Sequence, residues 1–309
     1  MIRNQCCTKW RWIMFNSNVS RPISGAFMES MQRTTAVGLV LACLVSAAIA
    51  ETRKEFRYTV HTKAKANISV DTQYGSITVK PGYANQVVIL ALQESKADID
   101  HLQKGNRIEI ESHLLPGADG QSGRVDYELT VPPNATVSLR SSTGPLTIER
   151  LRGDLSLEGA DAPIEVRNSG GGHVHINTMK GTITLTEVRS AHIELASISG
   201  DIRLSSVSGP FVQVKSGSGN ISYDGDFGSD GDYTFTTHTG NIEALVAASA
   251  SADFNARSVH GQVQSELPLV PSEKPKFPVN ANSFAGTVGK ASSEVVFTSI
   301  SGKIRLKRR

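Results

Sequence analysis

An aliphatic side chain recurs every nineteen residues through the middle of the chain, and this period constrains the fold more than any other feature. Two interleaved series carry it: Ile164, Ile183, Ile202 and Ile221 form one, and Leu155, Val174, Ile193 and Val212 form the other. A second apolar residue follows two positions after each member, with a polar residue between them. Such strict alternation is the period of a β-strand, and it argues against helix in this stretch.

A small or kinking residue precedes each apolar pair, as Gly181, Gly200 and Gly219 do in one series. We expect these glycines to adopt positive φ, which glycine takes without steric cost. A short strand cannot bury its apolar face alone, but coils stacked about 4.8 Å apart align these faces into a stripe. The repeat therefore predicts an all-β solenoid, or β-helix-like fold, with two short strands in each coil of about 19–21 residues.

The pattern loosens downstream but continues to the end of the chain. The octet SISGDIRL at 197–204 returns as SISGKIRL at 299–306. Ile242 and Val263 follow at steps of twenty-one residues, and Ile304 lies 41 residues further on, close to two such steps. We therefore expect Ile304 in the last coil.

The rest of the chain divides by composition and strand length. Residues 141–309 hold the solenoid repeats, and a proline-rich loop at 267–280 is expected on the surface because proline cannot enter a sheet interior. Residues 51–140 hold longer strands with irregular spacing. We expect them to form an N-terminal β region that caps the open end of the solenoid.

The first fifty residues contain all three cysteines, both tryptophans and four of the five methionines. From Met31 a basic residue, an apolar run and Ala48-Ile49-Ala50 predict a signal peptide at 31–50, with 1–30 an over-called leader. The alternatives are a genuine long leader, lipidation at Cys43, and an uncleaved anchor. All predict a protein exported to the periplasm, the cell surface or the medium, which meets a membrane only if lipidated or left uncleaved.

Charge and cysteine usage exclude two classes of function. Beyond residue 50 the chain has 27 basic and 28 acidic residues, so no basic excess points to nucleic acid. The same part has no cysteine, which excludes disulfides and thiol chemistry there.

Several segments resemble one known family. They are VDYELTVPPNATVSLRSSTGPLTIERLRGDLSLEG, the SGN and SGD corners, ADFNARSVHGQVQSELP and the closing SISGKIRL. Together they resemble the bacterial putative-adhesin domain of unknown function, over about residues 55–309. The resemblance implies an exported β-solenoid and brings no catalytic residues or cofactors with it.

Outward positions beside Val174 and Ile193 carry ionisable side chains. These are His173, His175, His192 and Glu194. Adjacent coils would bring them to one patch, and imidazoles with a carboxylate suit zinc or copper. The alternative is a solvated sheet face that happens to carry histidines.

An acidic stretch, DGDFGSDGD, offers a second possible metal site. Its carboxylates are Asp224, Asp226, Asp230 and Asp232. Oxygen-rich loops suit calcium, but Gly228 and Phe235 stand where an EF-hand needs ligands. An ordinary polar turn between coils is the alternative.

The strand-forming acids give no clear catalytic pair. Asp154 and Asp201 belong to different series and should lie on different faces, and Glu165 and Glu243 stand four coils apart. A glycosidase needs two carboxyls flanking one bond. The closing KIRLKRR is expected on a terminal strand, where charge prevents edge pairing; contact with anionic envelope polymers or lipid is the alternative.

These observations predict a non-enzymatic, adhesin-like envelope or surface protein without an obligatory cofactor. Its repeated polar β faces would bind glycans, envelope polymers or surface proteins, and no nucleic acid. The alternatives are a β-helix enzyme acting on polysaccharide and a periplasmic envelope-stress accessory protein.

Overall fold

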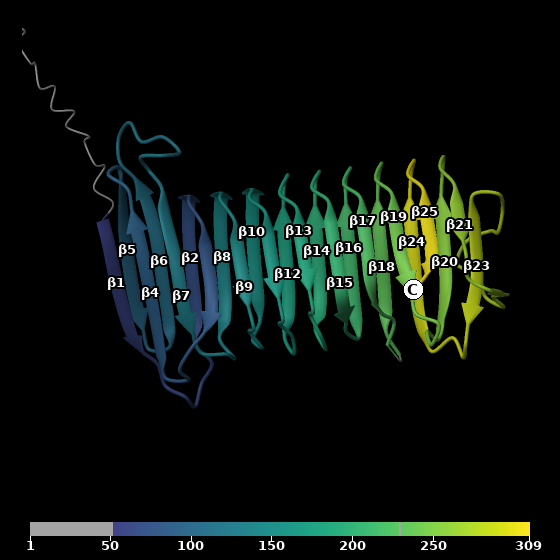
Figure 1. Cartoon of the computed structure of the whole chain (residues 1–309), viewed down its shortest axis with the longest axis horizontal. Coiled ribbons are helices and arrows are strands. Elements are labelled where there is room, and N and C mark those ends of the chain that lie inside the picture. Colours follow the sequence, from purple (N-terminus) through teal and green to yellow (C-terminus); the bar gives the residue numbers. More distant parts are fainter. Residues whose placement is uncertain (1–51, 229) are drawn as a thin grey trace, which may run out of the picture. The chain divides into compact units, whose positions relative to one another are not determined.

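Two sheets, each made largely of parallel strands, face each other across one apolar core (Figure 1). The computed structural model describes residues 52–228 and 230–309. The predicted leader, signal peptide and Cys43 lie outside these residues. All the regular secondary structure in these residues is β-strand. They contain no helix long and apolar enough to cross a bilayer.

The first sheet, called sheet A here, has twelve strands in the described residues. In spatial order they are β1 (Thr52–Thr59), β4 (Gln86–Gln93), β7 (Val125–Val131), β3 (Ile77–Pro81), β9 (Leu146–Glu149), β11 (Ile164–Arg167), β13 (Ile183–Thr186), β15 (Ile202–Ser208), β17 (Ile221–Asp226), β19 (Ile242–Val246), β25 (Ile304–Arg308) and β21 (Val263–Ser265).

The second sheet, sheet B, has thirteen strands in the same residues. In spatial order they are β22 (Val270–Pro271), β23 (Ser283–Val288), β20 (Ala252–Ser258), β24 (Ser293–Ser299), β18 (Asp232–Thr237), β16 (Phe211–Ser216), β14 (His192–Ser197), β12 (His173–Thr178), β10 (Leu155–Asp161), β8 (Thr136–Thr143), β2 (Asn67–Tyr74), β6 (Arg107–Leu114) and β5 (Ala97–Lys104).

The predicted vertical stacks are present, and the solenoid is confirmed. Ile183 pairs in register with Ile202, and Ile202 pairs with Ile221. In sheet B, Val174 pairs with Ile193. All of these side chains are buried, and each contributes about 1.5–3 kcal/mol when fully removed from water.

The corner glycines are needed for a different reason from the one expected. Gly181, Gly200 and Gly219 do not have positive φ. A Cβ on Gly200 would instead collide with the carbonyl oxygen of Gly181, and one on Gly219 would collide with that of Gly200. Glycine is required here because successive coils stack backbone against backbone at the corner.

A buried hydroxyl closes each of these corners. Thr178 Oγ1 accepts a hydrogen bond from the N–H of Gly181 at 3.0 Å, and Ser197 Oγ accepts one from Gly200 at 2.8 Å. Equivalent bonds recur in other coils, from Gly219 to Ser216, Gly240 to Thr237, Gly261 to Ser258 and Gly302 to Ser299. The Ser/Thr-x-x-Gly spacing is therefore a corner motif, which satisfies a backbone donor that would otherwise be buried unpaired.

Positive φ occurs at the opposite corners, on residues other than glycine, and also on Gly75 and Gly144, which hold the corner-glycine position in earlier coils. Arg150, Asn168 and Glu187 directly follow β9, β11 and β13, and Ser206 lies at the bulge inside β15; their φ values are between 52° and 55°. In the coils that contain Gly181, Gly200 and Gly219, the two corners are thus built by different means.

The coils at the C-terminal end do not follow the order of the sequence. Ile304 pairs with Ile242 on one side and with Val263 on the other. β25 therefore lies between β19 and β21, and the expectation that it forms the last coil and a terminal strand is wrong. Identical apolar positions make every coil a suitable neighbour for every other, so spacing along the chain does not decide the stacking order.

The proline-rich segment lies at the end of sheet B. β22 pairs antiparallel with β23 at the sheet edge, where a proline without an N–H is tolerated. Beyond it, the N–H of Lys276 donates to Asn255 Oδ1 at 2.9 Å. The segment thus contacts β20 rather than projecting freely.

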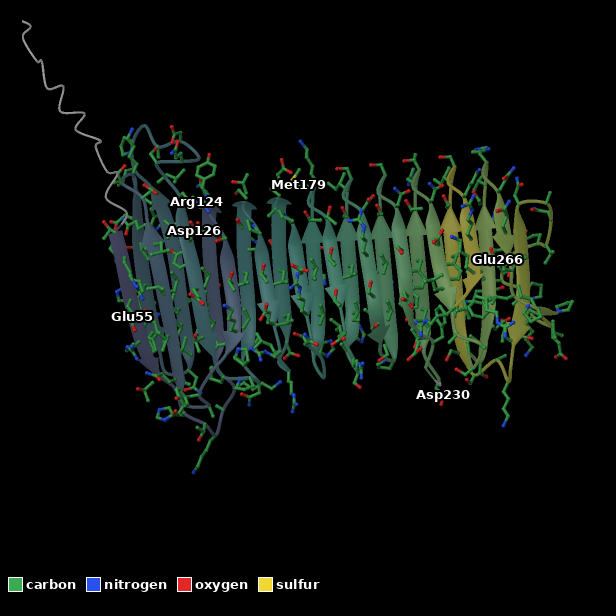
Figure 2. All side chains as sticks on the ribbon, viewed as in Figure 1. Glu55, Arg124, Asp126, Met179, Asp230 and Glu266 are labelled. Atoms are coloured by element: carbon green, nitrogen blue, oxygen red, sulfur yellow. The ribbon has the colours of Figure 1, made fainter. Side chains whose placement is uncertain are left out.

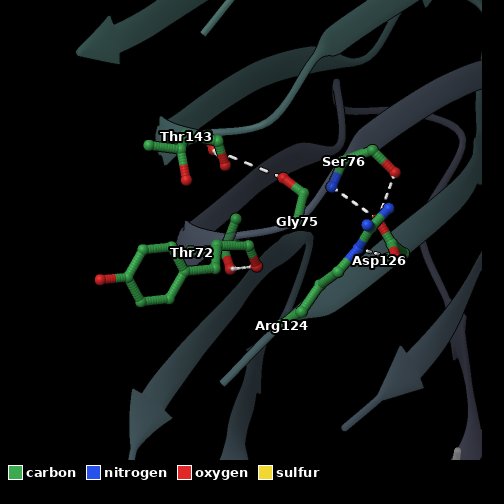
Figure 3. Close-up of polar contacts among 8 residues, drawn as sticks. Thr72, Gly75, Ser76, Arg124, Asp126 and Thr143 are labelled. Atoms are coloured by element: carbon green, nitrogen blue, oxygen red, sulfur yellow. Dashed lines mark hydrogen bonds and ion pairs between the residues drawn. The ribbon is translucent and has the colours of Figure 1, made fainter. Parts of the chain in front are cut away.

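The N-terminal strands also stack out of sequence order. β6 and β7 pair in parallel with β2 and β3, which in turn pair with β8 and β9. Asp126 fixes this contact: its Oδ1 accepts hydrogen bonds from the N–H and hydroxyl of Ser76, and its Oδ2 accepts one from Arg124 Nε at 2.6 Å (Figure 3). Burial would raise the pKa of Asp126, but the hydrogen bonds from Arg124 and Ser76 outweigh it and hold that pKa below its ordinary value.

Candidate functional site

An open groove of about 710 Å³ runs across the ends of five stacked sheet B strands, where each turns towards sheet A. We call it the corner groove. It is lined by Arg140, Ser141, Ser142, Glu158, Gly159, Ala160, Asn177, Thr178, Met179, Ala196, Ser197, Ile198, Lys215, Ser216 and Gly217.

One side of the corner groove is a column of outward side chains. In register these are Arg140, Glu158, Asn177, Ala196 and Lys215, one from each of β8, β10, β12, β14 and β16. An Arg140–Glu158 ion pair of 2.5 Å stands at one end and the exposed Lys215 at the other. The small Ala196 leaves room between them.

The other side is an exposed apolar ridge on the turns. Met179 is 53% exposed and Ile198 is 60% exposed, each directly after the buried hydroxyl of its corner motif. Figure 2 shows Met179 on one long edge of the sheets and Asp230 on the opposite edge. The sequence signal for this ridge is an apolar residue at a turn position that alternation assigns to solvent, and the strand period alone does not reveal it.

The predicted convergence of histidines is present. His173 pairs in register with His192, and their ring centroids are 4.9 Å apart; the ring of Phe211 stacks on His192 at 4.2 Å. His192 Nε2 lies 3.1 Å from Glu194 Oε1, and His175 Nδ1 lies 3.4 Å from Glu194 Oε2. The hydrogen bond from His192, together with that from His175, holds the pKa of Glu194 below its ordinary value.

The atoms that would have to coordinate a metal ion are already engaged in these contacts within the protein. Glu194 engages both histidines through its two oxygens, and His175 Nε2 lies 2.9 Å from the Asn177 amide nitrogen. No set of three or more His, Cys, Asp or Glu side chains in the described part of the chain has an arrangement suited to a metal ion. The zinc or copper set stays a prediction, and no function is built on it.

Three of the four predicted calcium ligands are divided between the two sheets, and Asp230 lies in the turn that connects them. Asp224 and Asp226 belong to β17 of sheet A, whereas Asp232 begins β18 of sheet B. The guanidinium of Arg309 bonds to Asp224 and lies 3.2 Å from Asp226 Oδ1, so a side chain of the protein already supplies the positive charge there. The calcium site also stays a prediction.

The acids considered for catalysis have partners. Asp201 Oδ2 accepts from Arg203 at 2.8 Å, and Glu165 pairs with Arg167. Asp154, just before β10, pairs with Lys65, just before β2, and hydrogen bonding from the backbone N–H of His173 keeps the pKa of Asp154 below the ordinary value. Asp154 precedes β10 of sheet B and Asp201 precedes β15 of sheet A, so they are separated as their series predicted.

The fold and the site define a repetitive β-solenoid whose surface carries open grooves. A family model described as Toastrack DUF4097 matches residues 65–307. The chain belongs to this family, and the resemblance found in its sequence is thereby confirmed.

Two solved structures are similar to this chain, both at 11% identity. One is a putative cell adhesion protein from Clostridium sporogenes, matched over 84% of this chain and 100% of that one with a TM-score of 0.27. The other is a putative adhesin from Bacteroides fragilis, matched over 84% and 98% with a TM-score of 0.45. No curated protein matches the chain.

Proposed function

We propose that this protein is a non-enzymatic, adhesin-like protein of the cell envelope or surface, and that its corner groove binds an extended stretch of glycan. The observation that carries the proposal is the lining of the groove, in which an apolar ridge faces a polar column across several coils. A sugar ring is amphipathic in the same way, with C–H groups on its faces and hydroxyls around its edge.

The dimensions of the groove support a polymer rather than a single small molecule. Five coils at about 4.8 Å spacing extend over about 19 Å from first to last, and each coil presents equivalent positions. Repeated weak contacts along one chain add up to useful affinity.

Binding is favoured over catalysis because the groove offers one carboxyl group, Glu158, and Arg140 pairs with it. Glycoside cleavage needs a pair of carboxyl groups, one on each side of the glycosidic bond. The runner-up, a polysaccharide-active enzyme, would have to use acids from outside this lining, and an envelope-stress accessory role would use the same groove for another envelope polymer.

The experiment is a glycan and cell-wall array probed with protein purified from cells that express the full chain. Met179→Ser with Ile198→Ser should lower affinity for the bound glycan by about tenfold, because both apolar side chains of the ridge are lost. Val259→Ser is the matched control, since Val259 is 41% exposed at the same turn position but outside the groove.

Three results would contradict the proposal. Equal binding by the groove variant and the wild type would place the ligand elsewhere. New reducing ends in the bound glycan would indicate an enzyme, and capture of proteins alone would indicate a peptide ligand.

A further inference from the structure

A second groove, of about 560 Å³, lies on the outer face of sheet A where β17, β19 and β25 run side by side. We call it the basic groove. Three equivalent rows build it, one from each strand. Their polar side chains are Asn220, Ser222, Asn241, Glu243, Lys303 and Arg305.

A ladder of amides fixes one side of the basic groove. Asn220 Oδ1 accepts from the backbone N–H of Asn241 at 2.9 Å and from its side-chain amide at 3.2 Å. Asn241 Oδ1 accepts from the backbone N–H of Lys303 at 2.8 Å. The ladder oxygens are thus used within the protein, whereas each amide nitrogen has a second hydrogen to offer.

The only carboxylate in the lining is also engaged. Glu243 Oε2 lies 2.8 Å from Lys307 Nζ. What the groove presents to a ligand is therefore mainly hydrogen-bond donors and positive charge.

Two cations of the basic groove lack the carboxylate partner that Arg167 and Arg203 have on other strands of sheet A. Arg167 and Arg203 each pair with an acid in their own strand or just before it. Lys303 and Arg305 are both exposed, and neither forms an ion pair with any described residue. They alternate with the buried Ile304, so they point to the same face about 6–7 Å apart.

The stacking order of the coils makes this pair rigid. Because β19 and β21 flank β25, the backbone that carries Arg305 is hydrogen-bonded on both sides. A preorganised pair loses less entropy on binding than two cations on a free terminal strand would.

We propose that the basic groove binds the carboxylate groups of an acidic polysaccharide, independently of what occupies the corner groove. The guanidinium of Arg305 can hold a carboxylate through two parallel hydrogen bonds, and Lys303 can neutralise the next acidic group along the polymer. Amide and hydroxyl donors of Asn241 and Ser222 match the uncharged hydroxyls between them.

Two other anionic partners fit the groove less well. A membrane surface would gain from apolar side chains inserted beside the cations, but the exposed large hydrophobic residues of the described chain lie outside this groove. Single-stranded nucleic acid would gain from aromatic stacking, and the groove lining contains no aromatic side chain.

The experiment measures binding of the full-length protein to polygalacturonate, with dextran as a neutral polymer and phosphatidylglycerol vesicles as an anionic membrane. Lys303→Ala with Arg305→Ala should weaken binding to polygalacturonate by at least about tenfold. Binding should weaken with added salt, and Lys303→Arg with Arg305→Lys should retain part of it.

Arg53→Ala with Lys104→Ala is the matched control, since it removes the same charge from exposed positions at the other end of the sheets. Its affinity should equal that of the wild type. An equal loss in both double variants would reduce the effect to net charge and overturn the proposal, as would equal binding to dextran, or binding to vesicles alone. The corner-groove variant Met179→Ser with Ile198→Ser should bind polygalacturonate normally, so that failure of one proposal leaves the other open.

Discussion

Ile242 and Ile304 are direct partners in adjacent parallel strands, although β20 to β24 separate them in the chain. Both are almost completely buried. The strand that closes the sequence is thus inserted into the solenoid between two coils that precede it, and the pairing of β19 with β25 depends on contacts made far apart in the sequence.

Ile304→Ala should therefore destabilise the protein as a core mutation does, by about 2–5 kcal/mol in the free energy of unfolding. Urea unfolding followed by circular dichroism measures it. Val263→Ala, in the outer coil and only partly buried, should cost clearly less. An equal or larger cost at Val263 would contradict the observed order of the coils.

Gly200→Ala tests the close approach of the backbones at the corner. Because the new Cβ would meet the Gly181 carbonyl oxygen, the coils must shift, and we expect a loss of about 1–3 kcal/mol. Gly120→Ala is the control, since its Cβ would meet only the Tyr74 ring at 3.7 Å. Both are measured by the same unfolding experiment, and equal stability of the two variants would argue against stacked corners.

Ser197→Ala tests the corner motif itself. It leaves the buried N–H of Gly200 without an acceptor, which should cost about 1–3 kcal/mol. Ser205→Ala, at an exposed position, should change stability by less than about 0.5 kcal/mol. Restored stability in Ser197→Thr would show that the hydroxyl matters, because Thr178 makes the same bond in the coil before it.

Asp126 should make stability depend on acid pH. Since folding lowers the pKa of Asp126, its contribution is complete above the unfolded pKa and is lost as the pH falls through the folded one. Asp126→Asn should cost about 1–3 kcal/mol at neutral pH, and the difference from wild type should shrink below about pH 4. A difference that stays constant into acid would contradict a stabilising role for the ionised Asp126 and its bonds to Ser76 and Arg124. Asp161→Asn, at an exposed position, controls for general acid effects.

The apolar period was enough to predict which residues stack and which side chains become neighbours. Ile183 lies on Ile202 because both belong to one series, and His173 lies beside His192 for the same reason. The positions of the corner glycines could be predicted from the sequence, but the physical reason that glycine is required there could not. Whether a glycine avoids a φ penalty or a backbone collision depends on the neighbouring coil, which no local pattern contains.

The two grooves show the same limit from another side. In the sequence, Met179 and Ile198 are two separate apolar residues at turn positions. They form a ridge facing the polar column that ends at Lys215 only because the coils stack in register. Lys303 and Arg305 were expected on a terminal strand and lie instead between two strands.

The sequence by itself determined the coil: two short strands, their buried faces, their corners and the spacing between equivalent positions. Only the tertiary structure decided the order in which coils stack at either end, and with it which polar side chains share a groove. The reason is that burial of aliphatic side chains is non-directional and rewards any coil placed on any other, so it specifies the coil but not its neighbour.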